Sequence, residues 1–216
     1  MANWLDDPLM IHEEGSISYK QPKSLERNGG PKWESFHFST RLKLEAADHF
    51  CRLALGAASM PDDLGSSLLA FRQTKWYLDA FFFELMSAYD TLLQELNVVY
   101  DINRDIEKVT WSSIKGKLPD PLKELMESER NAAWFKRLCW YRNTATHRMY
   151  LPTGASTGGY GETPRDYGYH YVRLFYVDTD TNEWNCEHIN EACPNYLKKM
   201  TNHIHGVWTK MAEEFD

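Results

Sequence analysis

The stretch that decides the fold is residues 64–96, LGSSLLAFRQTKWYLDAFFFELMSAYDTLLQEL. Apolar side chains recur there at helical spacing, and neither Gly nor Pro interrupts the run after Gly65. Such a run is typical of one long helix, because Gly and Pro are the residues that most often break helices. We therefore predict a helix of about thirty residues that begins near Asp62.

Helical spacing of apolar residues also occurs before and after this stretch. Ser39 and Thr40 have the chemistry of helix caps and precede the first such pattern, which stops near Pro61. A second long helix is expected after Pro121, with residues 142–147 as its last turns. The remaining expected helices are a short one over 104–115 and a closing one over 190–215, which has Pro194 in its first turn.

Three segments depart from the helical pattern. Residues 1–35 contain scattered Gly and Pro, which predicts an irregular N-terminal arm. Residues 152–164 are rich in Gly, Ser and Thr and predict a mobile loop. Aromatic and β-branched residues in 167–177, followed by a polar turn and residues 183–188, predict a β-hairpin. The expected fold is mainly all-α: one helical bundle domain over 36–216, with a loop and hairpin inserted at about 152–188.

Composition restricts the class of protein. Apolar residues make up 43% and aromatic residues 14% of the 216 residues, which is enough for a packed core and argues against disorder. No apolar stretch approaches the ~20 residues of a membrane helix. The N-terminus lacks the pattern of a signal peptide, and the four Cys show no CxxC spacing. We expect a cytoplasmic protein with reduced thiols and no membrane partner.

The run Arg142-Asn143-Thr144-Ala145-Thr146-His147 carries the candidate chemistry. It lies within residues 130–148, which hold five Arg or Lys and no Asp or Glu, although the formal net charge of the chain is −7. A local reversal of charge suits a ligand that bears phosphate.

The spacing of this run pairs two polar side chains. On a helix, Asn143 and His147 share one face, about 40° apart, while Arg142 flanks that face and must reach across it. Arg supplies a fork of donors for a phosphate, and His exchanges a proton near neutral pH. Together they suit phosphodiester cleavage. The same residues also suit a structural role, because Arg and His near a helix C-terminus interact favourably with the helix dipole.

The helical layout and the Arg-Asn-x-x-x-His run together resemble the HEPN superfamily, whose signature is Arg-x(4 to 6)-His, usually with a polar residue after the Arg. Arg142, Asn143 and His147 match this signature residue by residue. The resemblance covers about residues 39–150 and the closing helix from 190.

The resemblance implies a metal-independent endoribonuclease that uses no cofactor, or a nucleotide-binding relative. His147 would act as the acid and base while a 2′-hydroxyl attacks the adjacent phosphate, Arg142 would stabilise the developing charge, and Asn143 would orient His147 or bind a phosphate. The partners implied are RNA, expected to be single-stranded, and a second copy that completes one cleft. Many HEPN members belong to toxin–antitoxin or phage-defence systems, which allows for an antitoxin-type protein partner.

Other polar residues carry weaker signals. Arg137 and Arg148 are our candidates for positioning the phosphates of RNA. No metal site is predicted, because the Cys and His residues of the C-terminal third lack the paired short spacing of structural zinc. These residues are Cys186, His188, Cys193, His203 and His205.

Two further groups stay outside the predicted site. The acidic residues of the long helix are interpreted as part of a solvated face, and three tyrosines on one strand face are expected to pack on the bundle rather than stack on bases. The acidic residues are Glu84, Asp90 and Glu95, and the tyrosines are Tyr167, Tyr169 and Tyr171.

Two classes of function therefore stay open. One is a HEPN-like ribonuclease. The other is a catalytically inactive HEPN-like module that binds nucleic acid or protein. In the second, His147 would be buried neutral or bonded to a carbonyl, and Arg142 would pair with an acidic residue of the long helix.

Overall fold

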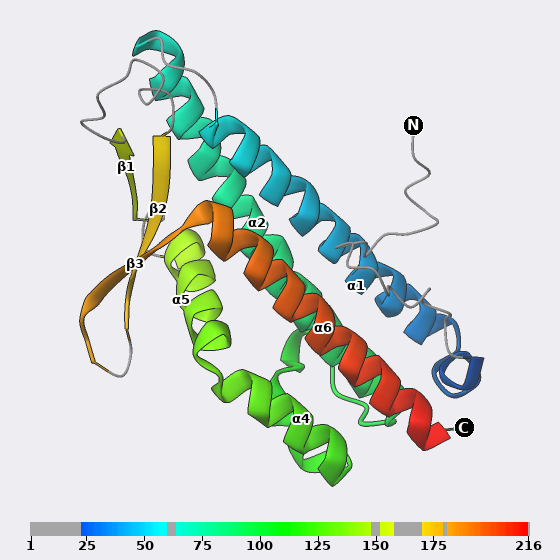
Figure 1. The fold of residues 1–216 in the computed structure, drawn as a ribbon. Helices are drawn as coiled ribbons and strands as arrows, with labels where there is room; N and C mark the ends of the chain where they lie inside the picture. Colours follow the sequence, from blue (N-terminus) through cyan, green and yellow to red (C-terminus); the bar gives the residue numbers. More distant parts are fainter. Residues whose placement is uncertain (1–22, 60–63, 148–151, 158–169, 179–180, 216) are drawn as a thin grey trace. The chain divides into compact units, whose positions relative to one another are not determined.

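The structure is a computed structural model that describes residues 23–59, 64–147, 152–157, 170–178 and 181–215. It is mainly helical, with three short strands before the C-terminal helix, and this confirms the predicted fold class (Figure 1). In chain order the elements are α1 (Lys23–Ala58), α2 (Leu64–Val99), η1 (Ile106–Lys108), α3 (Trp111–Ile114), η2 (Lys115–Lys117), α4 (Asp120–Asn131), α5 (Ala133–His147), β1 (Thr153–Thr157), β2 (His170–Val177), β3 (Trp184–His188) and α6 (Ile189–Phe215).

The first helix begins earlier than predicted. Helix α1 starts at Lys23, so the irregular arm predicted over 1–35 is wrong for residues 23–35, and the rest of that arm lies outside the described residues. The physical reason is that the glycines and the proline interrupt the helix at one point only. Gly30 adopts φ 57°, and Pro31 follows at a position where a helix can restart, because a proline suits a first turn.

The expected caps of that helix lie in its interior instead. The Ser39 hydroxyl donates to the Ser35 carbonyl four residues earlier at 2.8 Å. The Thr40 hydroxyl donates to Glu95 Oε1 of α2 at 2.5 Å. Both residues therefore satisfy their hydroxyls without ending the helix, which is the alternative to capping that Ser and Thr have within a helix.

The long helix α2 is confirmed, whereas the second long helix is wrong. Residues 120–147 form two helices, α4 and α5, because Ala132 has an extended backbone with φ −64° and ψ 142°. Alanine is the strongest helix former, so the sequence contains no sign of this break. The expected short helix over 104–115 is divided into η1, α3 and η2.

The predicted hairpin is confirmed as β2 and β3, and a third strand extends it. Strand β1 pairs antiparallel with β2, so that the order in the sheet is β1-β2-β3. The mobile loop predicted over 152–164 is therefore wrong for residues 153–157, and residues 158–164 lie outside the described residues. Pairing with β2 supplies the backbone hydrogen bonds of β1, and this tertiary effect overrides the loop-like composition.

The described residues form two compact units. Unit 1 takes its residues from 1–45, 85–132 and 198–216, and unit 2 takes its residues from 46–84 and 133–197. The single helical domain over 36–216 stays a prediction. No helix in the described part of the chain has both the length and the apolar character needed to cross a membrane.

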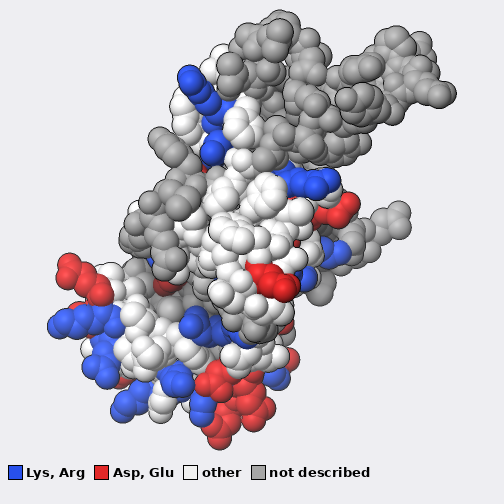
Figure 2. Space-filling model, turned by 90° about the vertical axis from the view of Figure 1, so that its left-hand side faces the viewer, with Lys and Arg blue, Asp and Glu red and all other residues white. Residues whose placement is uncertain are grey.

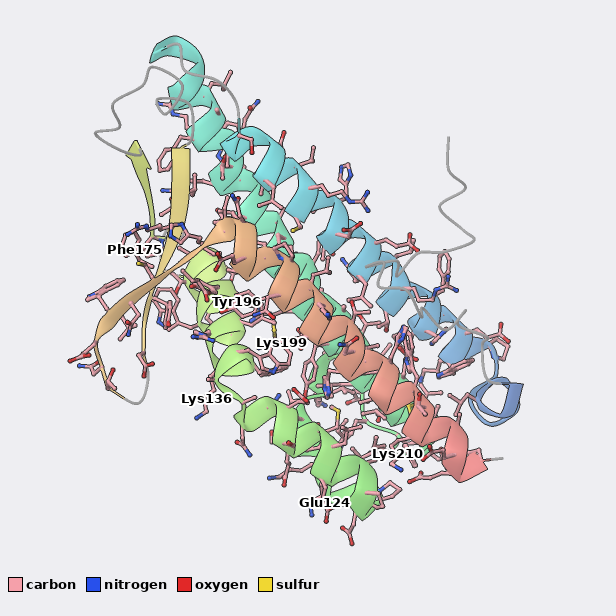
Figure 3. The ribbon with its side chains drawn as sticks, in the orientation of Figure 1. Glu124, Lys136, Phe175, Tyr196, Lys199 and Lys210 are labelled. Atoms are coloured by element: carbon pink, nitrogen blue, oxygen red, sulfur yellow. The ribbon has the colours of Figure 1, made fainter. Side chains whose placement is uncertain are left out.

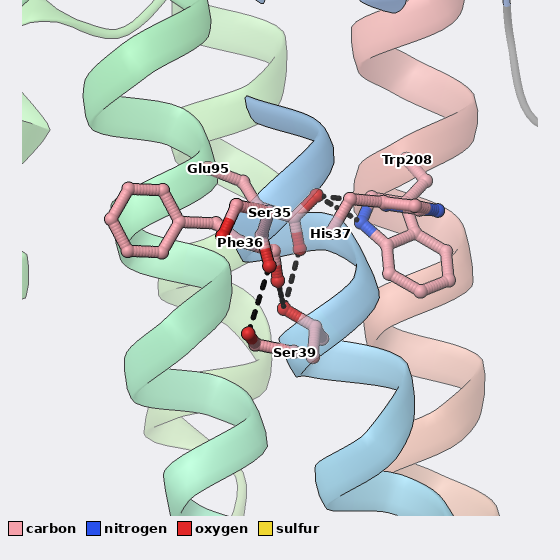
Figure 4. A network of polar contacts seen from close by, with 7 residues as sticks. Ser35, Phe36, His37, Ser39, Glu95 and Trp208 are labelled. Atoms are coloured by element: carbon pink, nitrogen blue, oxygen red, sulfur yellow. Dashed lines mark hydrogen bonds and ion pairs between the residues drawn. The ribbon is translucent and has the colours of Figure 1, made fainter. Parts of the chain in front are cut away.

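Unit 1 is organised around a buried carboxylate. Glu95 has no exposed surface, and it accepts hydrogen bonds from Thr40, from His37 Nδ1 at 3.0 Å and from Trp208 Nε1 at 3.0 Å (Figure 4). The His37 ring stacks on Trp33 with the centroids 4.7 Å apart. Removing one partner from such a network would leave a buried polar atom without its hydrogen bond. The network therefore ties α1, α2 and α6 together within this unit.

Unit 2 is organised around buried aromatic rings. Phe82 of α2 stacks on Tyr141 of α5 with the centroids 4.7 Å apart. Tyr141 also meets Tyr176 of β2 and Tyr196 of α6 edge-on, each at 6.1 Å. Aromatic pairs in these geometries add to the gain from burying their area. One ring of α5 thus contacts α2, the sheet and α6, and this contact sets the position of α5.

Candidate functional site

Helix α5 carries the predicted catalytic run at its C-terminal end. Arg142 is half-buried and Asn143 is exposed, and the Arg142 Nη1 atom donates to Asn143 Oδ1 at 3.2 Å. A carboxamide whose oxygen is engaged in this way keeps its NH₂ group as a donor. His147 is the last residue of α5, one turn after Asn143. The His147 side chain and all of Arg148 lie outside the described residues.

The opposite side of α5 is fixed by burial. Tyr141 is fully buried and Thr144 is nearly so, whereas Asn143 and Thr146 are exposed. The Thr146 hydroxyl donates to the Arg142 carbonyl four residues earlier at 2.8 Å, which satisfies the hydroxyl within the helix. The helix therefore presents Asn143 to solvent while its other side is held in the core of unit 2.

A carboxylate of the sheet anchors this helix. Glu187 Oε1 of β3 accepts hydrogen bonds from the Tyr141 hydroxyl at 2.8 Å and the Tyr196 hydroxyl at 2.6 Å. Burial, followed by the negative charge of Glu187, raises the pKa of both tyrosines. Both phenols therefore stay protonated and act as donors at neutral pH. Figure 3 shows Tyr196 on the side of α6 that faces α5.

Arg137, a predicted RNA-binding residue, contacts the sheet. Its Nη1 atom donates to the Tyr176 hydroxyl at 3.0 Å, and its guanidinium carbon lies 5.2 Å from the centre of that ring. Burial alone would lower the pKa of Arg137, but Tyr196, Tyr176 and Glu187 together raise it, so the side chain is a permanent cation. Its contact with RNA stays a prediction.

Two tryptophans beside the run were missed by sequence reasoning. Trp140 of α5 and Trp184 of β3 meet edge to face, with centroids 6.4 Å apart and planes at 88°. Trp184 is 64% exposed, more than any other large apolar side chain of the described residues. The spacing of Trp140 to His147, seven residues on a helix, is the signal that could have found the first of them.

The acidic residues of α2 lie in different environments. Asp90 is exposed, as predicted, and Glu84 is half-buried. Glu95 is fully buried in the network of unit 1, so its interpretation as part of a solvated face is wrong. Its donors come from α1 and α6, far away in the sequence, and the pattern of one helix does not reveal such partners.

The Cys and His residues of the C-terminal third do not assemble into a metal site within the described part of the chain. That part contains no group of three His, Cys, Asp or Glu side chains placed to hold a metal ion. Cys193 is buried, and its burial raises the pKa of its thiol. Tyr167, Tyr169 and the side chain of Tyr171 lie outside the described residues.

Charge on the surface is mixed. On the face shown in Figure 2, Lys and Arg side chains occur among Asp and Glu, and the described residues form no continuous positive surface there. Helix α5 differs from this pattern, since it holds Lys136, Arg137 and Arg142 and no acidic residue. An anion would therefore be attracted locally, along α5, and not by a long-range field.

Comparison with known families agrees with this helical arrangement. The sequence matches the family model described as Cthe2314-like HEPN over residues 44–212, so the chain belongs to the HEPN family. The matched range encloses the strands and continues into α6. Membership indicates a nuclease, another RNA-related module or a nucleotide-binding module. No curated protein and no solved structure matches the chain.

Proposed function

We propose that this protein is a metal-independent endoribonuclease that cleaves single-stranded RNA, with Arg142, Asn143 and His147 as its catalytic residues. The observation that carries the proposal is the Arg142–Asn143 pair on the acid-free helix α5, with His147 one turn further along that helix. The family to which the chain belongs supports the same class of chemistry.

The proposed reaction is an attack by the ribose on its own phosphodiester. The 2′-oxygen bonds to phosphorus as the bond from phosphorus to the 5′-oxygen breaks, which leaves a 2′,3′-cyclic phosphate and a 5′-hydroxyl. His147 takes the proton of the 2′-hydroxyl and returns a proton to the leaving oxygen. Arg142 stabilises the negative charge on the phosphoryl oxygens, and the NH₂ group of Asn143 binds the phosphate or orients His147.

The proposal includes the partners expected from the sequence. A second copy of the chain would bring a second Arg142 and His147 to one cleft and double its positive charge. A neutralising, antitoxin-type protein would fit a toxin or phage-defence role.

The test compares the wild type with His147→Ala and Arg142→Ala on end-labelled single-stranded RNA in excess EDTA. Wild type should release products that end in cyclic phosphate, and each variant should be slower by about 10²-fold or more. His49→Ala and Arg72→Ala, exposed residues of the same types on other helices, are the matched controls and should cleave like wild type.

Thermal unfolding first establishes that all five proteins fold alike. Equal cleavage by all of them, or cleavage that needs added Mg²⁺, contradicts the proposal. RNA binding without cleavage by wild type would instead favour the inactive binding module.

A further inference from the structure

One stripe of α5 joins four different side chains. Lys136, Trp140, Asn143 and His147 follow one another at intervals of four, three and four residues. At 100° per residue these positions lie within about 60° of one another around the helix. Lys136 and Asn143 are exposed and Trp140 is half-buried. Figure 3 shows Lys136 projecting from α5 on the side away from Tyr196.

The sheet adds an aromatic ring to this stripe. Trp184 is the first residue of β3, opposite Val177 of β2, and its ring contacts Trp140 edge to face. The contact holds the ring against α5, yet 64% of Trp184 stays exposed. The face of this ring is therefore open to a planar ligand, and a nucleobase stacks on such a face.

From this arrangement we propose that Trp184, supported by Trp140, is a base-stacking subsite for single-stranded RNA beside the catalytic run. The proposal rests on the proposed function, because it assigns one nucleotide of the same substrate. Along the helix axis, Trp140 and His147 are about 10 Å apart, a distance spanned by about three stacked nucleotides. The stacked base therefore belongs to a nucleotide about three positions away from the one that is cleaved.

The charges of α5 and of the residues before β3 indicate where the phosphates and the base of the RNA bind. Lys136, Arg137 and Arg142 on α5 attract the phosphates. Trp184 instead follows the exposed Glu183, and the half-buried Asp178 begins the turn that leads to it. Carboxylates repel a phosphate but not the face of a base, so the ring receives the base while the backbone of the RNA follows α5.

The experiment measures binding without cleavage. A fluorescent single-stranded oligonucleotide with 2′-O-methyl groups cannot supply the attacking hydroxyl, and fluorescence anisotropy reports its Kd. Trp184→Ala should weaken binding by about 5- to 150-fold, which is the range of one stacked base. Trp184→Phe should keep most of the affinity. Trp76→Ala removes a 54% exposed tryptophan of α2 and should bind like wild type.

A second series of binding measurements identifies which base of the RNA stacks on Trp184. The series consists of oligonucleotides that each lack one base. For one of them, the affinity of wild type should fall by the same factor as the Trp184→Ala substitution causes. The affinity of Trp184→Ala for that oligonucleotide should equal its affinity for the complete one. Unchanged affinity of Trp184→Ala overturns the subsite even where wild type cleaves RNA. Binding by wild type without any cleavage overturns the proposed function and leaves the subsite intact. Absence of RNA binding, or a Trp184-dependent self-association in its place, overturns the subsite.

Discussion

At the scale of single residues, Glu187 links the sheet to the helix that carries the Arg142–His147 run. One of its oxygens accepts both the Tyr141 and the Tyr196 hydroxyl, and Tyr141 lies directly before Arg142 in α5. The orientation of the last turns of α5 is therefore determined by a carboxylate of β3. A residue next to the candidate run is thus held by a residue 46 positions further along the chain.

His203 is a residue whose ionisation affects stability. It is buried in unit 1, where its ring stacks on Tyr89 with centroids 6.0 Å apart. Burial, with a smaller contribution from the charge of Arg130, lowers its pKa to about 4. In the unfolded chain this imidazole binds a proton near its ordinary pKa of ~6.5. The contribution of His203 to the free energy of unfolding is therefore present above that pH and is lost as the pH falls toward 4.

We therefore predict that the free energy of unfolding of wild type falls on lowering the pH from 7.5 to 5.0, and that His203→Phe reduces this fall by about 2 kcal/mol. Urea denaturation at both pH values measures the difference, which does not depend on how stable the variant is. Asn202→Ala, an exposed neighbour on α6, should keep the wild-type fall. An equal fall in wild type and His203→Phe would show that another group is responsible.

The sequence predicted the local part of the site and missed its tertiary part. Arg142, Asn143 and His147 occupy the end of a helix as expected, because their spacing is a property of one helix. The contact of Tyr141 with Glu187 and the approach of Trp184 to Trp140 depend on elements distant in sequence. No pattern within one element contains that information.

At the scale of elements, α1 contains a break that only one residue type tolerates. Gly30 has φ 57° and ψ −160°, a region that is nearly restricted to glycine. A side-chain carbon built there would meet nothing within 4 Å, so the cost of a substitution is backbone strain alone. Gly56 lies in the same helix, is exposed, and also has open space around it.

These two glycines should respond to alanine with opposite signs. Gly30→Ala should lower the free energy of unfolding by about 1–3 kcal/mol, because the strained conformation is retained. Gly56→Ala should raise it by about 0.5 kcal/mol, since alanine favours the helical backbone. Chemical denaturation of the two variants beside wild type measures both changes. A neutral or stabilising Gly30→Ala would mean that the helix continues through this position.

Some elements form because of signals in their own sequence, and others form because of contacts with distant elements. Helix α2 and the β2–β3 hairpin were predicted because an uninterrupted apolar period and a polar turn are local signals. Strand β1 was missed because its hydrogen bonds come from β2, and the break at Ala132 was missed because alanine gives no sign of an interruption. The predicted arm failed where Gly30 and Pro31 interrupt a helix without ending it.

At the scale of the whole molecule, the net charge of −7 opposes long-range attraction of RNA. Binding must then depend on a few local cations, chiefly Lys136, Arg137 and Arg142 of α5. Single-stranded nucleic acid releases counterions in proportion to the phosphates neutralised, with a slope of about −0.7 per contact in log K against log salt. The slope of the salt dependence therefore gives the number of cations that contact one RNA.

This count tests the proposed composite cleft. Three cations from one chain give a slope of about −2, and two chains that share one RNA give about −4, which is the value we predict. Titration of the 2′-O-methyl oligonucleotide at several salt concentrations measures this slope.

Lys136→Ala should make the slope less steep by about 1.4 in the composite cleft, because each of the two copies loses one contact. In a single-chain site the same substitution should make the slope less steep by about 0.7. Lys123→Ala on α4 is the matched control and should leave the slope unchanged. A slope near −2 with the smaller effect of Lys136→Ala would assign the site to one chain and contradict the shared cleft, while leaving the roles of Arg142 and His147 intact.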